Sequence, residues 1–291
     1  MSRELDPSIF PPSRLEGAAI FTVDVEDYFM SPECIPFEDW PKYVSCLHAG
    51  MERCLNLLQA YRARATFFFV GWAAERYPDL VRWTVEQGHE VATHTYTHRF
   101  VSEMNEREFE ESLVRSLEVL RGLTGGQEVI GHRAPAFSLD RRTPWMFEIL
   151  HRHGIRYDSS IMPHRTYLYG DDQAPRFPYR LHGVVEIPPG VVAWAGKRWP
   201  LGGGGTLRIL PNWYLRWARN RFRREGYTPV VYVHPWEYVP EQPRLALPWK
   251  LRWIHYAGLG SMVRKTRAIL EEGPVITMRE YYETLRGEAD H

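Results

Sequence analysis

Short apolar runs alternate with amphipathic segments along most of this chain, and that alternation limits the folds it can adopt. A buried strand is predicted to begin within 18–29, and apolar residues then recur at helical spacing through 44–62. Because strands that alternate with helices pair in parallel, the sequence predicts an α/β fold. Further strands are predicted at 65–71, after Gly88, and at 129–135, 155–161, 184–190, 228–238 and 275–277. Further helices are predicted at 80–91 (stopping at Gly88), 107–125, 143–154, within 248–272 and at 278–287.

The length and composition favour a single globular domain. The chain has 291 residues, of which 44% are hydrophobic and 25% charged, an ordinary balance for a protein with a sizeable core. We find no internal repeat and no linker that would divide it, and α/β barrels of this length often form one domain. The predicted organisation is an N-terminal arm at 1–17, a domain at 18–285 and a tail at 286–291.

Charge and motif content exclude several classes of protein. Lys plus Arg and Asp plus Glu both number 36, which argues against a nucleic-acid partner. No GxGxxG or GxxxxGK[ST] pattern follows a predicted strand, so a nucleotide site is not expected. The glycine run 202–205 is expected to be a mobile loop near the cleft.

The sequence predicts a cytoplasmic protein without a transmembrane segment. No stretch of 18 apolar residues occurs, and the first residues lack the apolar run of a signal peptide. Reduced thiols are therefore expected. Of the three cysteines, Cys46 and Cys54 fall within a helical pattern and are predicted to be small buried residues.

Polar residues follow several of the predicted strands. The first strand ends in DVED, the third runs into HTYTH, and later ones end in GHRAP, YDSS and HP. The spacing of His94 and His98 alone fits a surface loop as well as a metal site. In a parallel barrel, however, the carboxyl ends of the strands meet at one rim, and catalytic groups gather there. Carboxylates, histidines and an arginine at one rim would form a metal-dependent hydrolase site.

These motifs together resemble the polysaccharide deacetylase (NodB-homology) superfamily, carbohydrate esterase family four. The resemblance runs from about 18 to 285, and its H-[ST]-x-x-H motif is His94-Thr95-Tyr96-Thr97-His98. The chain is most similar to the branch found with exosortase and PEP-CTERM exopolysaccharide loci, whose C-terminal part corresponds to about 196–285. The resemblance implies a distorted (β/α) barrel in a single domain.

The resemblance also assigns roles to individual residues. Asp24 is expected to be the general base, Arg133 the residue that positions it, His234 the general acid, and Asp158 the carboxylate that orients this acid. An arginine near Asp24 would keep the pKa of that carboxyl low, and a carboxylate near His234 would raise the pKa of the imidazole.

The implied metal is Zn²⁺ or another divalent transition metal, held by His94, His98 and one acidic residue of DVED. In an extended strand, side chains 24 and 26 share a face, which favours Glu26; Asp27 becomes possible if the strand ends at Val25. Pro135 and Trp236 are expected to bind substrate.

The expected function is removal of acetyl from an N-acetylated amino sugar in a polysaccharide or its precursor, as part of exopolysaccharide biosynthesis. Two alternatives stay open at this point. One is an allantoinase-like hydrolase of a small non-sugar amide, which would have a closed pocket where a glycan enzyme has an open cleft. The other is a catalytically silent binding protein of an exopolysaccharide system, which would lack part of the base, ligand and acid set.

Overall fold

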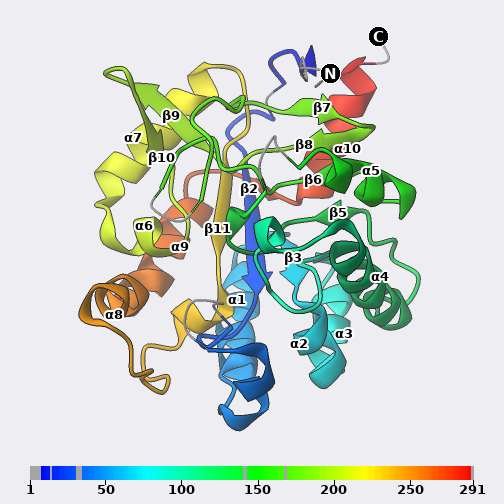
Figure 1. The fold of residues 1–291 in the computed structure, drawn as a ribbon. Coiled ribbons are helices and arrows are strands. Elements are labelled where there is room, and N and C mark those ends of the chain that lie inside the picture. Colours follow the sequence, from blue (N-terminus) through cyan, green and yellow to red (C-terminus); the bar gives the residue numbers. More distant parts are fainter. Residues whose placement is uncertain (1–7, 14, 31–34, 140–142, 167–168, 290–291) are drawn as a thin grey trace.

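A ten-stranded, mostly parallel sheet forms the centre of the protein (Figure 1). The computed structural model describes residues 8–13, 15–30, 35–139, 143–166 and 169–289. The parallel strands are β2 (Ala19–Val25), β3 (Thr66–Phe69), β4 (Glu90–Thr93), β5 (Gly131–His132), β6 (Tyr157–Asp158), β8 (Val184–Glu186), β11 (Val230–Val233) and β12 (Val275–Ile276). Two antiparallel strands, β7 (Tyr179–Leu181) and β1 (Ser8–Ile9), extend the sheet beyond β8. The predicted α/β class and distorted barrel are confirmed.

Helices surround this curled sheet, and a separate hairpin lies beside it (Figure 1). The α-helices are α1 (Leu47–Ala60), α2 (Gly71–Arg76), α3 (Pro78–Glu86), α4 (Glu106–Leu123), α5 (Trp145–Arg152), α6 (Gly204–Ile209), α7 (Asn212–Arg224), α8 (Trp249–Tyr256), α9 (Met262–Leu270) and α10 (Met278–Ala289). Single 3₁₀ turns are η1 (Phe37–Lys42), η2 (Val101–Glu103), η3 (Pro135–Phe137), η4 (Pro235–Tyr238) and η5 (Leu259–Ser261). The hairpin consists of β9 (Val191–Trp194) and β10 (Lys197–Pro200).

The central strand β2 is buried on both faces, and its two faces have different neighbours. Phe21 and Val23 belong to the large core cluster that also contains the buried faces of the surrounding helices. Ile20, on the other face, packs in a smaller cluster with Met278 and Tyr281 of α10, which fills one end of the barrel interior. Because side chains alternate along a strand, this register also turns Asp24 inward.

Local sequence signals explain where several helices begin and end. Helix α4 begins with a capping box, in which Asn105 and Glu108 each accept from the other's backbone N–H. Helix α3 begins with Pro78, whose missing N–H costs nothing in the first turn. Gly88, just beyond the end of α3, has a φ of 78°, a conformation that glycine adopts without strain.

One predicted helix is divided in the structure, and both ends of the chain contain regular elements. The predicted helix within 248–272 is two helices, because Gly258 has a φ of 74° and ends the helical path between α8 and α9. Residues 8 and 9 of the predicted arm form β1, which pairs with β7, and the predicted tail 286–291 continues α10 as far as Ala289. Residues 1–7, 14 and 290–291 of these two segments lie outside the described part of the chain.

The predicted mobile loop at 202–205 is a packed helix start. Gly203 and Gly204 are buried, and α6 begins at Gly204. A side chain on Gly203 would collide with the ring of Tyr232, so glycine is required there by close packing. Cys46 and Cys54 are buried, as predicted, whereas Cys34 lies outside the described residues. Within the described part of the chain, every helix is too short or too polar to cross a bilayer.

The glycine at position 50 allows α1 to contact the turn that follows β11. We expect Gly50→Ala to destabilise the protein by about 1–3 kcal/mol, because its new methyl group would collide with the backbone of Pro235. The matched control is Gly122→Ala, which places a methyl group in open space on α4 and should stabilise by up to about 1 kcal/mol. Denaturant unfolding of both variants measures the difference, and equal stabilities would contradict this close contact.

Candidate active site

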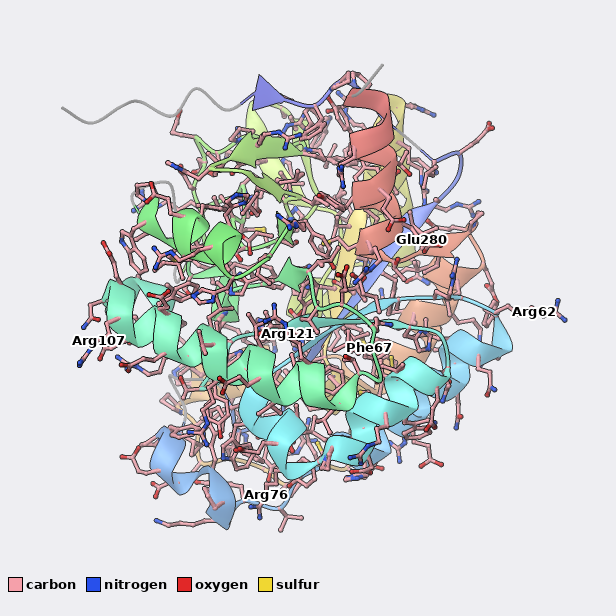
Figure 2. All side chains as sticks on the ribbon, turned by 90° about the vertical axis from the view of Figure 1, so that its right-hand side faces the viewer. Arg62, Phe67, Arg76, Arg107, Arg121 and Glu280 are labelled. Atoms are coloured by element: carbon pink, nitrogen blue, oxygen red, sulfur yellow. The ribbon has the colours of Figure 1, made fainter. Side chains whose placement is uncertain are left out.

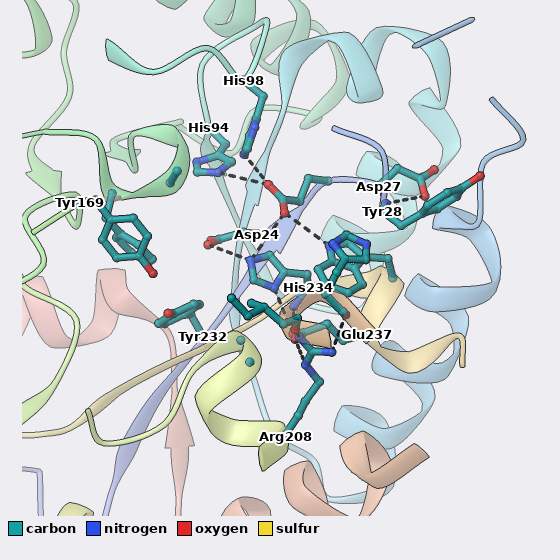
Figure 3. Close-up of a pocket in the computed structure, with 18 of the residues that line it drawn as sticks. Asp24, Asp27, Tyr28, His94, His98, Tyr169, Arg208, Tyr232, His234 and Glu237 are labelled. Carbon is teal, nitrogen blue, oxygen red and sulfur yellow. Dashed lines mark hydrogen bonds and ion pairs between the residues drawn. The ribbon is translucent and has the colours of Figure 1, made fainter. Parts of the chain in front are cut away.

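Five polar side chains lie at the carboxyl ends of the parallel strands, and four of them line one pocket (Figure 3). Asp24 is near the end of β2 and Glu26 follows it, while His94 follows β4, Arg133 follows β5 and His234 follows β11. These strands are neighbours in the sheet order β5-β4-β3-β2-β11, so residues more than 200 positions apart in the sequence come together. The rim location expected from parallel pairing therefore holds for this set.

The segment from His94 to His98 is a tight turn and not a helix. Thr95 and His98 have φ values of 59° and 52°, in the left-handed region that non-glycine residues rarely adopt. The turn is held from outside, where the N–H of Gly71 donates to the Thr95 carbonyl at 2.8 Å. This conformation brings the His98 ring back beside that of His94, with ring centroids 5.0 Å apart.

Glu26, His94 and His98 form a group that can hold a metal ion. One ligand atom of each residue lies within 4.8 Å of the other two. The Glu26 carboxylate contacts His98 Nε2 and lies 3.9 Å from His94 Nε2. Two imidazoles and a carboxylate are the donors of many catalytic zinc sites, which leave further positions open.

The hydrogen bonds and charges of this group match what a metal requires. His94 Nδ1 lies 2.6 Å from the carbonyl of Arg133 and must donate to it, which leaves the lone pair of Nε2 facing Glu26. Burial and the neighbouring His98 hold the His94 pKa well below its usual value, so the ring is neutral. Although burial opposes it, His98 and His234 lower the pKa of Glu26 and keep it a carboxylate. Neutral imidazole and ionised carboxylate are the metal-binding forms.

Asp27 does not join this group. Its buried carboxylate accepts from the N–H groups of Tyr28 and Cys46, at 3.0 and 3.1 Å, beside the start of α1. Figure 3 shows it turned away from the histidines. Strand β2 does end at Val25, the condition under which Asp27 was a possible ligand, yet Glu26 keeps the inward direction of Asp24.

Asp24 forms a buried ion pair with Arg133. The guanidinium donates to Asp24 Oδ1 at 2.6 Å and to Thr22 Oγ1 at 2.9 Å, and also to Ser159. Burial raises the pKa of Asp24 above its usual value in spite of the opposing effect of Arg133. The expectation that Arg133 keeps the pKa of Asp24 low was therefore wrong, because the removal of the carboxylate from water outweighs the ion pair.

His234 faces Asp24 from the end of the adjacent strand, β11. Its Nε2 lies 4.0 Å from Asp24 Oδ2 and 3.7 Å from Glu26 Oε1. On the other side of the ring, Nδ1 lies 3.0 Å from Glu237. Burial would lower the pKa of His234, but the carboxylates of Glu237, Glu26 and Asp24 raise it to about 9. The imidazole is therefore a cation at neutral pH.

Two residues that support His234 were not predicted from the sequence. Glu237 is fully buried and pairs with Arg208 Nε at 2.8 Å. Arg208 comes from α6 and also donates to three carbonyls at the end of α8, those of Ile254, His255 and Ala257. The spacing His-Pro-x-Glu could have indicated Glu237, since a glutamate three residues after a turn start often bonds back to it. No sequence pattern indicates Arg208.

Asp158 does not orient His234, so this expected role is wrong. The two strands β5 and β6 are in register at His132 and Asp158, which places their side chains together. Asp158 accepts from Ser160 Oγ and pairs with His132 Nδ1, both at 2.6 Å. Ser160 in turn accepts from the N–H of Ala134 at 2.7 Å. Asp158 thereby supports the loop of Arg133 and not the acid.

Four of the rim residues, Asp24, Glu26, His94 and His234, line a pocket, and aromatic rings form part of its wall (Figure 3). Trp236 lines it, stacked between His234 at 5.5 Å and His255 at 4.5 Å between ring centroids. Pro135 is buried and does not line the pocket; its neighbours Ala134, Ala136 and Phe137 do. On another side the wall is α8 and the segment before it, through Leu247, Leu251, Ile254 and His255.

Comparison with known proteins finds two family matches along the chain. Residues 34–157, less than half of the chain, match the polysaccharide deacetylase family, and residues 159–283 match a family described as a domain of unknown function, DUF3473. Of the site residues, Glu26 precedes the first match, His94 and His98 lie within it, and His234 lies within the second.

Named relatives match this chain over part of their length. The chain is 34% identical to the peptidoglycan deacetylase of Helicobacter pylori over 169 residues, which are 57% of this chain and 54% of that protein. It is 38% identical to a chitooligosaccharide deacetylase of Sinorhizobium fredii over 81 residues, 28% of this chain and 38% of the relative. The chain thus matches about half the length, or less, of these curated relatives.

A solved structure shares the fold over nearly the whole chain. A Mycobacterium smegmatis protein assigned as a polysaccharide deacetylase superposes with a TM-score of 0.67, covering 98% of this chain and 96% of the other. Its sequence identity is 23%, so the likeness concerns the fold.

Substitution of Glu26 should weaken metal binding, whereas substitution of Asp27 should lower the stability of the fold. We expect Glu26→Gln to weaken Zn²⁺ affinity by more than the ~10–100-fold typical of outer-shell residues, because it removes a direct ligand. Asp27→Asn should leave the affinity within a few fold and instead lower the unfolding free energy by about 1.5–3 kcal/mol, the value of a charged hydrogen bond.

Competition with a chromophoric chelator and denaturant unfolding measure the two effects. Weak zinc binding in Asp27→Asn with normal binding in Glu26→Gln would assign the ligand to Asp27.

Proposed function

We propose that this protein is a metal-dependent deacetylase that hydrolyses the N-acetyl amide of an amino sugar in a polysaccharide or its precursor. The observation that carries the proposal is the pair Asp24 and His234, a carboxylate and a cationic imidazole that face each other beside Glu26, His94 and His98. The names of the relatives, peptidoglycan and chitooligosaccharide deacetylases, support an N-acetylated glycan as substrate.

Glu26, His94 and His98 would hold the ion, which we propose to be Zn²⁺ or another divalent transition metal. When bound, such an ion lowers the pKa of water and polarises an amide carbonyl. Asp24 accepts the proton of the attacking water, and its raised pKa makes it a stronger base than an exposed aspartate. Arg133 holds the other carboxylate oxygen of Asp24 and so fixes the direction of the free one.

His234 supplies the proton that the leaving amine needs. An amine anion departs poorly, and a cationic imidazole can protonate the nitrogen as the carbon–nitrogen bond breaks. Glu237 accepts from Nδ1 and leaves Nε2–H directed toward the side of Asp24 and Glu26. Arg208 keeps Glu237 ionised, because it and His234 lower the Glu237 pKa against the effect of burial.

Several finer predictions accompany this proposal. Membership of the exosortase and PEP-CTERM branch, a role in exopolysaccharide biosynthesis, the cytoplasmic location and the domain boundaries stay predictions. An allantoinase-like small-amide hydrolase and a silent binding protein stay the alternatives. The presence of base, ligands and acid in one pocket supports an enzyme over the silent protein.

Acetate release tests the proposed function. We expect the zinc-loaded protein to release acetate from N-acetylglucosamine oligomers, and to lose this activity when a chelator removes the ion. Asp24→Asn should keep the metal and lose about 10²–10⁴-fold in turnover, because the water has no proton acceptor. Hydrolysis of small ureide amides without acetate release would favour the allantoinase-like alternative, and no hydrolysis by the loaded protein would favour the silent one.

Glu237 should control the alkaline limit of activity. The acid must be protonated, so activity falls as the pH rises through the pKa of His234. Glu237 raises that pKa, and Glu237→Gln should therefore move the alkaline limb of kcat/KM to lower pH. A divalent ion on Glu26 would oppose the rise in the His234 pKa in both the wild type and Glu237→Gln. The informative quantity is therefore the difference between the two proteins in the pH of the alkaline limb.

The matched control is Glu241→Gln, which removes an exposed carboxylate paired with Arg53 outside the pocket. It should leave the limb in place. An unchanged limb in a folded, zinc-binding Glu237→Gln protein would show that His234 is not the group that titrates there.

A further inference from the structure

Four exposed tryptophans cluster on the β9–β10 hairpin and on helix α7. Trp194 and Trp199 of the β9–β10 hairpin are 53% and 37% exposed, and Trp213 and Trp217 of α7 are 73% and 36% exposed. Ring centroids of Trp194 lie 6.2 Å from Trp199 and 5.7 Å from Trp217, so the two elements form one aromatic surface. Large apolar side chains gathered at a surface mark an interaction site.

The buried and the exposed residues of α7 lie on opposite sides of the helix. Its buried stripe consists of Leu215, Ala218, Arg219 and Phe222, at spacings of three and four residues. The opposite stripe, at the same spacings, is exposed and contains only tryptophan, arginine and asparagine: Trp213, Arg216, Trp217, Asn220, Arg221 and Arg224. We call this stripe, together with Trp194, Lys197 and Trp199, the tryptophan–arginine face.

The charge of this region contrasts with the neutral chain as a whole. No Asp or Glu occurs between Glu186 and Glu225, whereas Lys or Arg occurs at positions 197, 198, 208, 216, 219, 221, 223 and 224. Four of these cations are exposed on the face, namely Lys197, Arg216, Arg221 and Arg224. None of the four pairs with a carboxylate among the residues that the structure describes.

The combination of exposed indoles with unpaired cations fits an anionic bilayer surface. Trp prefers the headgroup level of a membrane, where its amphipathic ring lies at the boundary between water and lipid. Anionic lipids attract such cations without need for a fixed partner geometry. Trp194 is inclined at 56° to Trp199 and at 79° to Trp217, so the rings do not form one flat platform.

We propose that the tryptophan–arginine face docks this protein onto the surface of an anionic lipid bilayer. The indoles would insert among the headgroups while Lys197, Arg216 and Arg224 contact lipid phosphates. Helix α6, which lines the active-site pocket through Gly204, Gly205 and Arg208, directly precedes α7. Docking would therefore hold the pocket close to the bilayer. This inference does not rest on the proposed activity.

Vesicle sedimentation tests the docking surface. The full chain should sediment with vesicles of phosphatidylglycerol and phosphatidylcholine, bind far less to phosphatidylcholine alone, and be released by salt. Arg216→Gln combined with Arg224→Gln should weaken binding roughly 25-fold, since each cation near the surface contributes about 1 kcal/mol, or about fivefold. Trp213→Ser should also weaken it, and because this side chain is 73% exposed the change should leave the fold intact.

The matched control is Arg107→Gln with Arg121→Gln. Both residues are exposed on α4, on the side of the molecule that Figure 2 turns to the viewer, away from α7 in Figure 1. This control should bind vesicles like the wild type, and all variants should unfold at closely similar denaturant concentrations. Equal losses in control and test variants, no difference between anionic and neutral vesicles, or binding to soluble polygalacturonate but not to vesicles would each overturn the proposal.

Discussion

The buried side chain of Arg133 holds the site together. Its guanidinium reaches Asp24 and Thr22 on β2 and Ser159 after β6, while its own carbonyl accepts from His94. One residue therefore positions Asp24, the proposed base, and fixes the tautomer of His94, a candidate metal ligand. A buried cation of this kind is costly to leave unpaired; removing one partner of such a pair typically costs about 3–5 kcal/mol. The base and the ligand turn are thus tied to the stability of the barrel.

The order of the strands in the sheet explains how residues from both matched segments reach one candidate site. Strand β2, at the start of the chain, pairs with β3 on one side and with β11 on the other. The first neighbour leads on to the histidine turn, within the polysaccharide deacetylase match, and the second ends at His234, within the DUF3473 match. Glu26 precedes both matched segments, and His94, His98 and His234 are divided between them, so the candidate site draws on β2 and on both segments.

Strand periodicity was enough to predict part of the site from the sequence, whereas contacts between distant segments were not predictable. The inward direction of Glu26 is set by its spacing to Asp24, and the rim location of His234 is set by the apolar strand before it. The expected pairing of Asp158 with His234 could not be judged from the sequence, because the register of two strands places Asp158 beside His132. The glycine run 202–205 looked mobile by composition, yet the ring of Tyr232 packs against it.

Helix α8 forms part of the pocket wall and yet buries none of its residues. Arg208 holds its last carbonyls by three hydrogen bonds, and only the side chains at its end, His255 and Tyr256, pack against Trp236 and the core. Exposed positions tolerate substitution within about 0.5 kcal/mol, and Ile254, which is 40% exposed, can therefore be exchanged at little cost to stability. The fold separates the chemistry, which sits on rigid strands, from a replaceable wall. Related chains could diversify the molecules they accept by varying this one helix while every proton-carrying residue stays in place.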